Sequence, residues 1–386
     1  MEPSQIDLVF KISERCNLKC DYCYFFFGGD ETWKKHPPLV PRKVVQDLGG
    51  FAARAARDYK IESINLIFHG GEPLLMSKPR FSEMCETLRS YEDGFRFRFG
   101  LQTNAVLVDE EWIDIFERYS VGAGVSLDGP PAINDLHRLD MKGRSSYDGT
   151  VAGLRLLQKA AAKGKLNPPG LLSVINPFVD GATIYRHFVE DLGVTHMNFL
   201  TPDYTWDSVI PKEVILGVER FMLSALRAWL TGRNPKIHVR LYSELLAAMV
   251  HPRAMDMMKA YTNDYRNIIG VSSNGDLGPE DTLRTADPRF ATLGLNVATH
   301  NLRDLLESRA WQEQADAATV KPDKCQSCDW WTVCKGGRPL NRFSKAKGFG
   351  NHSIYCSGLQ NIYTEVGAFV VRNGTPLSEL ALRLAS

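Results

Sequence analysis

The chain has 386 residues, of which 44% are hydrophobic and 24% are charged. Lysine and arginine together number 46, and aspartate and glutamate number 45, so the formal net charge is +1. A charge so close to zero gives no reason to expect nucleic acid or an anionic membrane as a partner. The composition is that of a globular protein with an ample core, and it excludes the collagen-like and disordered classes.

The sequence lacks the run of about eighteen apolar residues that a transmembrane helix needs. Its N-terminus, MEPSQIDLVFKISERC, has no basic start followed by an apolar core, so it does not read as a secretory signal. We therefore predict a cytoplasmic protein with no membrane partner. In a reducing compartment, the eight cysteines are expected to be metal ligands or reactive thiols rather than disulfides.

Strands and helices are predicted to alternate over the first half of the chain. The apolar runs predict strands at Asp7–Ile12, Ser63–His69, Arg96–Thr103, Gly122–Leu127, Leu171–Val174 and His196–Leu200. The intervening stretches predict helices at Pro41–Asp58, Phe81–Tyr91, Asp109–Tyr119, Tyr147–Lys163 and Ala182–Leu192. Such alternation predicts a parallel sheet with right-handed crossovers, either open or closed into a barrel. In both cases ligands bind at the carboxyl ends of the strands.

The pattern changes after residue 210. Helices are predicted at Lys212–Trp229 and Leu241–Tyr261, and from Asn267 onward the chain is expected to be rich in loops, with short strands and turns. A short amphipathic helix is expected from Pro376. These changes suggest four consecutive segments, at residues 1–210, 211–262, 263–365 and 366–386.

The first cysteine cluster follows the first predicted strand directly. Cys16, Cys20 and Cys23 form a CxxxCxxC motif, and three thiolates on one short loop can bind three irons of a [4Fe–4S] cluster while the fourth iron stays open. A structural zinc ion would need a fourth ligand, and the nearest histidine is His36. Three unrelated thiols, or part of a zinc site, remain the alternatives.

A CxxxCxxC motif after the first strand of an alternating β/α pattern resembles the signature of the radical S-adenosylmethionine (SAM) enzymes. The resemblance spans residues 6–205 and implies a partial (β/α)6 barrel. In that family the open iron chelates SAM, and one electron from the cluster releases a 5′-deoxyadenosyl radical that abstracts a hydrogen atom from the substrate.

Further residues resemble that family's SAM-binding positions, although each alone could be an ordinary turn or surface residue. Tyr22 matches an aromatic position near the adenine, and Arg138 suits the SAM carboxylate. A GGEP motif follows the second strand, where glycines allow close approach and a glutamate can orient the SAM amino group. The ends of strands three and four add polar side chains for the amino acid and ribose parts. These positions are Gly70, Gly71, Glu72, Pro73, Gln102, Thr103, Asn104, Ser126 and Asp128.

The second cysteine cluster is CxxC-x5-C followed by a distant cysteine. Its members are Cys325, Cys328, Cys334 and Cys356. Zinc is the alternative, because CxxC loops commonly bind it. The stretch resembles the SPASM extension of peptide and protein maturases, which implies an auxiliary [4Fe–4S] cluster held by four thiolates. Lone Cys85 is expected to be a buried small hydrophobic residue.

The sequence also departs from the SPASM pattern. Arg338 and Glu280 stand where that pattern usually has cysteines, and no cysteine occurs between residues 86 and 324. These losses remove the ligands of the other auxiliary cluster as a set, so we expect two [4Fe–4S] clusters in total. Asp281 follows Glu280, at a place where sulfatase-maturing relatives have a candidate general base; a turn or capping aspartate is the alternative.

The resemblance implies an α/β fold in which a partial (β/α)6 TIM-like radical SAM barrel (1–210) precedes bridging helices, a SPASM-type iron–sulfur domain (263–365) and a tail helix. It implies a radical SAM oxidoreductase that modifies a precursor peptide and receives electrons from a carrier such as flavodoxin or ferredoxin. The segment CYFFFGGDETWKKHPP resembles maturases of ribosomal peptides that join an aromatic ring to a β-carbon, forming a cyclophane. Three alternatives stay open: an anaerobic sulfatase-type maturase that forms formylglycine, another peptide-modifying SPASM enzyme, and a non-enzymatic iron–sulfur or zinc protein.

Overall fold

The computed structural model describes residues 5–261 and 265–385. Contacts divide the chain into two compact units, each built from separate stretches of sequence. The first unit comprises Met1–Leu127, Pro131–Gly170 and Arg266–Gln312, and the second comprises Asp128–Pro130, Leu171–Tyr265 and Glu313–Ser386. The division into four consecutive segments stays a prediction from the sequence.

The sheet of the first unit contains the first four predicted strands. They are β1 (Ile6–Ser13), β2 (Ser63–Gly70), β3 (Arg96–Thr103) and β4 (Gly122–Ser126). The strand order is β4-β3-β2-β1-β8-β9, and the pairs from β4 to β8 are parallel. β8 (Ile268–Val271) lies beside β1, and the short β9 (Leu277–Gly278) runs antiparallel to β8. A late segment thus extends the N-terminal sheet, which the sequence did not predict.

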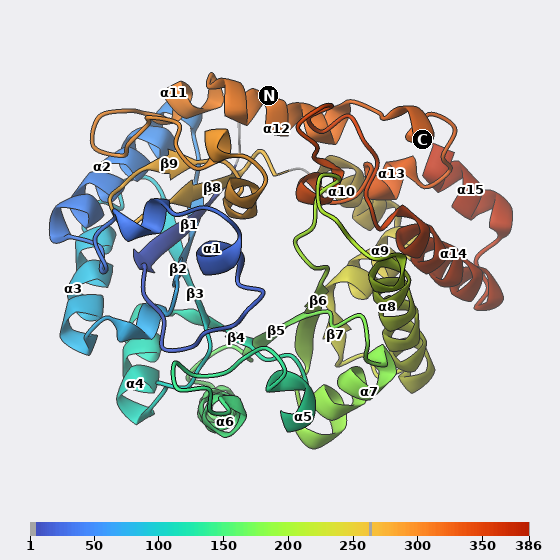
Figure 1. Cartoon of the computed structure of the whole chain (residues 1–386), viewed down its shortest axis with the longest axis horizontal. Helices are drawn as coiled ribbons and strands as arrows, with labels where there is room; N and C mark the ends of the chain where they lie inside the picture. Colours follow the sequence, from blue (N-terminus) through green and yellow to red (C-terminus); the bar gives the residue numbers. More distant parts are fainter. Residues whose placement is uncertain (1–4, 262–264, 386) are drawn as a thin grey trace. The chain divides into compact units, whose positions relative to one another are not determined.

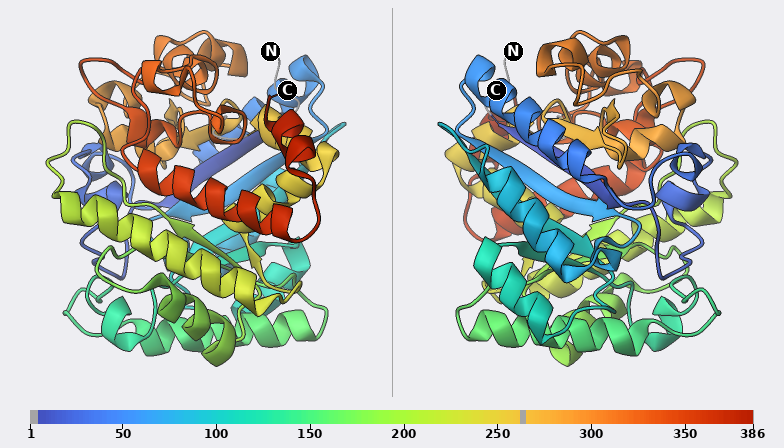
Figure 2. Two further views of the ribbon diagram at one scale, coloured as in Figure 1. Left: turned by 90° about the vertical axis from the view of Figure 1, so that its right-hand side faces the viewer. Right: turned by 90° about the vertical axis from the view of Figure 1, so that its left-hand side faces the viewer.

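Helices pack along these strands, as Figure 1 and the right view of Figure 2 show. They are α2 (Arg42–Tyr59), α3 (Lys78–Arg89), α4 (Glu110–Tyr119) and α6 (Tyr147–Ala162). α2 begins at Arg42 with Pro41 as its N-cap, one residue later than predicted. Asp109 caps α4 by accepting the backbone N–H of Trp112, so the carboxylate satisfies an N–H that the helix leaves open. Shorter helices are α1 (Tyr24–Phe27), α5 (Pro131–Asn134) and α11 (Leu302–Leu306).

The second unit holds the strands β5 (Gly170–Val174), β6 (His196–Leu200) and the two-residue β7 (His238–Val239), in the order β7-β6-β5. α7 (Gly181–Arg186) continues into a π-helical turn at His187–Asp191, and α8 spans Lys212–Gly232. The helix predicted at Leu241–Tyr261 is two helices, α9 (Arg240–Val250) and α10 (Pro252–Tyr261). Pro252 explains the break, because proline lacks the N–H that would continue α9 and instead suits the start of α10.

The C-terminal region is more helical than the sequence predicted. α12 (Arg309–Thr319) and α13 (Trp331–Cys334) precede α14 (Cys356–Arg372), and α15 (Leu377–Ala385) is the predicted tail helix. α14 packs against α8, as the left view of Figure 2 shows, and a side-chain carbon at Gly358 would lie 3.0 Å from Met222. Among the described residues, no helix is both long and apolar enough to span a bilayer.

Candidate active site

The cysteine loop follows β1 and is fastened to a segment far along the chain. The backbone N–H of Leu18 points at Cys16 Sγ at 3.4 Å, and Lys19 donates its N–H to the carbonyl of Leu139 at 2.8 Å. None of Cys16, Cys20 and Cys23 forms a disulfide. Burial raises the pKa of Cys16 to about 12 and also raises that of Cys23, so ionising these thiols requires a bound cationic group.

This donor set has the chemistry of an iron–sulfur cluster site. Among the residues that the structure describes, no three His, Cys, Asp or Glu side chains converge as the ligands of one metal ion would. A [4Fe–4S] cluster needs a wider arrangement, because each thiolate binds a different iron. Three partly exposed thiols on one loop can each supply one such ligand.

The glycines of the GGEP motif pack against the chain that leads into the cysteine loop. Gly70 has a φ of +143°, and a side-chain carbon there would lie 1.9 Å from the carbonyl oxygen of Ser13. At Gly71 the same carbon would lie 2.2 Å from the carbonyl oxygen of Arg15. Only glycine fits at both positions, so the pair fixes where the cysteine loop begins. Their contact with the methionine part of SAM stays a prediction.

Glu72 is 1% exposed and links the ends of β2 and β3. Its carboxylate accepts hydrogen bonds from the Leu74 N–H at 3.0 Å, the Thr103 hydroxyl at 2.7 Å and the Asn104 N–H at 2.9 Å. A carboxylate has about four acceptor positions, so one remains for an amino group. Burial raises the pKa of Glu72, and these three hydrogen bonds act against that rise.

The other predicted SAM contacts form pairs. The Arg138 guanidinium donates to the Tyr22 hydroxyl at 2.9 Å, and Gln102 Nε2 donates to the Ser126 hydroxyl at 2.7 Å. Asn104 Nδ2 donates to Asn17 Oδ1 at 2.7 Å, which ties the end of β3 to the cysteine loop. In the second unit, Asp128 accepts the Val174 N–H at 3.0 Å. Most of the predicted set therefore surrounds the cysteine loop.

Asp281 lies in a buried network of charges. Its carboxylate forms an ion pair with Lys11 and accepts a hydrogen bond from the Tyr24 hydroxyl, and Arg284 Nη1 lies 3.6 Å from it. Burial alone would raise the pKa of Asp281, but Lys11 and Arg284 outweigh that effect and lower it to about 2. Asp281 is therefore held as a carboxylate, and its role as a base stays a prediction.

The rest of the network balances its charge. Lys11 Nζ lies 2.7 Å from the Tyr24 hydroxyl and 3.1 Å from His69 Nδ1. Burial, and then Lys11, lower the pKa of His69 to about 3, so this histidine is neutral. Arg284 forms a second buried ion pair with Asp30 at 2.8 Å. Two cations thus face two carboxylates away from water.

Sequence reasoning missed Lys11, His69, Arg284 and Asp30. One signal was available: Lys11 lies inside the apolar run of β1 and is 0% exposed. A lysine at such a position requires a partner, because burying an unpaired ammonium group is costly.

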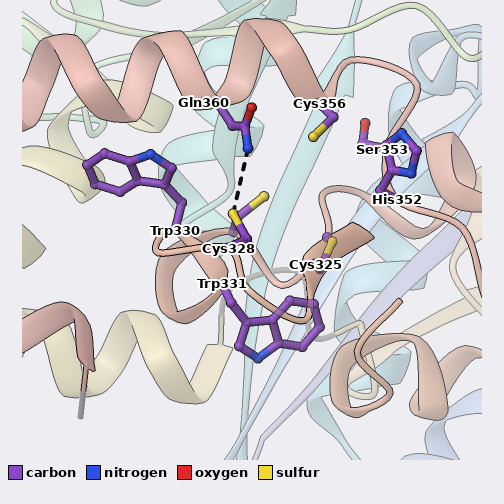
Figure 3. Close-up of a pocket in the computed structure, with 10 residues that line it drawn as sticks. Cys325, Cys328, Trp330, Trp331, His352, Ser353, Cys356 and Gln360 are labelled. Atoms are coloured by element: carbon purple, nitrogen blue, oxygen red, sulfur yellow. Dashed lines mark hydrogen bonds between the residues drawn. The ribbon is translucent and has the colours of Figure 1, made fainter. Parts of the chain in front are cut away.

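The second cysteine cluster lines a small cavity in the second unit (Figure 3). All four cysteines line it, together with Trp330, Trp331, Gly336, His352, Ser353 and Gln360. Gln360 Nε2 lies 3.7 Å from Cys328 Sγ, and Cys356 begins α14. Burial raises the pKa of Cys334 to about 12. Four cysteines that form no disulfide thus line one cavity, which is the donor set of a four-thiolate [4Fe–4S] cluster.

The two residues that stand in place of SPASM cysteines are charged, and each contacts a polar or charged side chain. Arg338 forms an ion pair with Asp203 at 2.6 Å in the second unit. In the first unit, Glu280 accepts a hydrogen bond from the Thr282 hydroxyl at 2.5 Å. Cys85 is fully buried in α3, as predicted.

Residues 10–174 match the sequence profile of the radical SAM superfamily. The chain carries a radical SAM domain. The matched range includes the cysteine loop, the GGEP motif and the Tyr22–Arg138 pair.

Comparison with solved structures extends the likeness beyond the radical SAM domain. Native anSMEcpe with bound AdoMet and Cp18Cys peptide superposes with a TM-score of 0.77 at 21% identity, covering 96% of this chain and 98% of that one. This likeness confirms the predicted fold class, a radical SAM barrel followed by a SPASM-type domain.

Curated relatives cover most of the chain at low identity. The serine-type anaerobic sulfatase-maturating enzyme of Bacteroides thetaiotaomicron is 24% identical over 94% of this chain and 89% of its own length. The cysteine-type enzyme of Clostridium perfringens strain 13 is 24% identical over 92% of this chain and 94% of its own length. An uncharacterized protein of Synechocystis is 24% identical over 87% of this chain and 84% of its own length. The match of residues 10–174 indicates radical SAM chemistry, for which SAM and a [4Fe–4S] cluster are the cofactors.

Proposed function

We propose that this radical SAM enzyme oxidises a side-chain β-carbon in a peptide or protein substrate. One observation carries the proposal: Asp281, a carboxylate held ionised by Lys11 and Arg284, is hydrogen-bonded to Tyr24, the residue directly after Cys23. A buried proton acceptor thus lies beside the loop that would hold the radical-generating cluster. The names of the relatives, sulfatase-maturating enzymes, support a peptide or protein substrate.

The residues have distinct roles in this proposal. Cys16, Cys20 and Cys23 would hold the SAM cluster, which when bound supplies the 5′-deoxyadenosyl radical that removes a hydrogen atom from the substrate. Tyr22, Glu72 and Arg138 would orient SAM, because they offer an aromatic ring, a carboxylate and a guanidinium around the cysteine loop. The remaining predicted contacts, Gln102, Thr103, Asn104, Ser126 and Asp128, would hold its polar groups. Cys325, Cys328, Cys334 and Cys356 would hold one auxiliary cluster that accepts an electron, which makes two clusters in total.

After hydrogen abstraction, the substrate must lose one electron and one proton. Asp281 is proposed to accept that proton. A carboxylate whose pKa is about 2 takes protons only from strong acids. The one-electron-oxidised substrate is such an acid, whether it is a protonated aldehyde equivalent or a ring carrying an extra proton. The low pKa of Asp281 therefore fits the second half of the reaction rather than the first.

Two fates of the substrate radical remain, and the sulfatase-type fate is better supported. Similarity to sulfatase-maturating enzymes covers 92–94% of the chain, which favours oxidation of a Cys or Ser side chain to formylglycine. Cyclophane formation is the second candidate. It is favoured by the segment CYFFFGGDETWKKHPP and by the charged residues Glu280 and Arg338 at positions where the SPASM pattern has cysteines.

One experiment separates the two fates. The reconstituted, reduced enzyme is incubated with SAM and either a sulfatase-derived peptide containing Cys or Ser or any short aromatic-rich peptide encoded beside its gene. Oxidation of Ser and formation of a crosslink both remove two hydrogens, so mass alone cannot discriminate between them. Reaction with an aminooxy probe labels the aldehyde only, whereas a crosslink resists the probe and alters the fragmentation pattern. Unchanged mass in every peptide, with SAM cleavage intact, would refute the peptide proposal.

A further inference from the structure

Two lysines flank one tryptophan at the four-cysteine cavity. Lys321 Nζ lies 5.5 Å and Lys335 Nζ 5.6 Å from the centre of the Trp331 ring. Figure 3 shows Trp331 beside Cys325 and Cys328. Lys335 directly follows Cys334 and has a φ of +49°, an uncommon conformation for a residue with a side chain. The surrounding fold therefore fixes the backbone conformation of Lys335.

Two more lysines join this group. Lys259 lies on α10, which packs against α13, and its charge acts on Lys335. Lys324 Nζ lies 3.3 Å from His352 Nε2, and His352 lines the cavity. The acidic residues of the same segment, Asp323 and Asp329, are both exposed. We call Lys259, Lys321, Lys324 and Lys335 the lysine rim.

The lysine rim does not follow from the overall charge, which is only +1. Gathered ammonium groups repel one another, so such a cluster costs free energy unless something negative faces it. The group held by the four thiolates would be one such partner, and an internal cation already balances part of its charge. Arg342 is 1% exposed, acts electrostatically on Cys325 and Cys334, and is held by the backbone carbonyls of Lys335, Phe349 and Asn351.

We propose that the lysine rim is the docking surface for an acidic one-electron carrier protein, which exchanges electrons with the group held by the four cysteines. Charge complementarity identifies the partner as acidic. The position of the rim at the cavity identifies it as a redox protein, because electron transfer requires the two redox groups to come close. The proposal rests on the need of the proposed reaction for single electrons, and it is independent of which side chain is modified.

The first test measures binding to the holoenzyme. Purified oxidised flavodoxin, an acidic flavoprotein, is titrated by calorimetry into wild type, into Lys259→Glu/Lys321→Glu and into Lys345→Glu/Lys347→Glu, an equal charge change at exposed residues elsewhere in the second unit. The rim variant is expected to bind about tenfold or more weakly, with a flatter dependence on salt, while the control binds as wild type does. Equal binding by the rim variant overturns the proposal. Equal affinity of wild type for a poly-glutamate peptide or a DNA duplex also overturns it, because the rim would then be a general anion surface.

The second test separates docking from folding and from the proposed reaction. Lys259→Gln/Lys321→Gln should keep the iron content and absorbance of wild type. SAM cleavage driven by dithionite should match wild type in this variant. Electron transfer from the reduced variant to oxidised flavodoxin, followed by the absorbance of the flavin, should slow in parallel with binding, while transfer to ferricyanide, which needs no docking, should keep the wild-type rate. Equal loss with both acceptors, or flavodoxin reduction at the wild-type rate, overturns the docking role. Failure of every peptide to react would reject the proposed function and leave the binding result standing.

Discussion

The buried pair of Lys11 and Asp281 yields the sharpest prediction. Lys11 is 0% exposed, and its ammonium group contacts the Asp281 carboxylate, the Tyr24 hydroxyl and His69. Replacing Asp281 by Asn removes one negative charge and leaves Lys11 and Arg284 facing each other. Breaking a buried pair by removing one partner costs on the order of 3–5 kcal/mol, because the remaining charge is buried without compensation.

The pKa of Asp281 gives a second estimate of the same interaction. It falls from 3.8 to about 2, a difference of about 1.8 units, and each unit corresponds to about 1.4 kcal/mol. The ionised carboxylate therefore stabilises the folded protein by on the order of 2 kcal/mol. Because the folded pKa is the lower one, this stability is fully present above about pH 4. It is lost as the pH falls toward about 2, and Asp281→Asn should lack this component.

A double-mutant cycle tests the reasoning. Asp281→Asn and Lys11→Met should each lower the free energy of unfolding, measured by urea denaturation of the anaerobically reconstituted protein at neutral pH. The double variant should lose less than the sum of the two, by on the order of 2 kcal/mol, because it leaves no unpaired charge at Lys11. The exposed pair Arg303–Glu307 is the control, and Arg303→Met with Glu307→Gln should leave the midpoint unchanged. Additive losses at Lys11 and Asp281 would refute the coupling.

Three further predictions concern the site. In Gly70→Ala, the total iron should fall from about eight per chain toward about four, because the new methyl group would overlap the carbonyl of Ser13 and disturb the first cluster. A total that stays at about eight would contradict this role. Cys356→Ala should also lose about four irons yet still cleave SAM when reduced. Cys85→Ala, the control, should change neither the iron content nor SAM cleavage. Loss of SAM cleavage in Cys356→Ala would mean that the two clusters are not independent. His69→Gln should leave the pH profile of SAM cleavage unchanged between about pH 6 and 9, because the pKa of about 3 keeps His69 neutral there; a shifted profile would show that His69 titrates.

The sequence predicted the strands of the barrel well because each is a short apolar run between turn residues. β3 and β6 match their predicted bounds, and the others differ by one residue or two. The π-helical turn at His187–Asp191 was not foreseen, because one extra residue in a helix leaves no clear trace in the apolar pattern. α14 was missed although Ile362, Val366 and Val370 recur every fourth residue and are buried. The cysteine pattern around it had favoured a loop-rich interpretation.

The cysteines and the GGEP motif were predictable because each is a local pattern. The Asp281 network was not, because its members come from β1, β2, the cysteine loop and the turn after β9, up to 273 positions apart in the chain (Lys11 to Arg284). Only the pairing of β1 with β8 brings that turn to Lys11, and a parallel pair with so long a connection has no sequence signature of its own. The isolated lysine in β1 was the one local clue.

The charged residues Glu280 and Arg338 lead to a last prediction. If they only replaced two cysteines, Glu280→Cys/Arg338→Cys would restore a second auxiliary cluster. We expect that it does not, because such a cluster needs four thiolates and no cysteine occurs between residues 86 and 324 to supply the other two. Iron should stay at about eight per chain, and the loss of the ion pair between Arg338 and Asp203 should be the main structural effect. An increase toward twelve irons, with a new paramagnetic signal after reduction, would show that other residues complete the site. It would also remove the argument that this enzyme works with one auxiliary cluster.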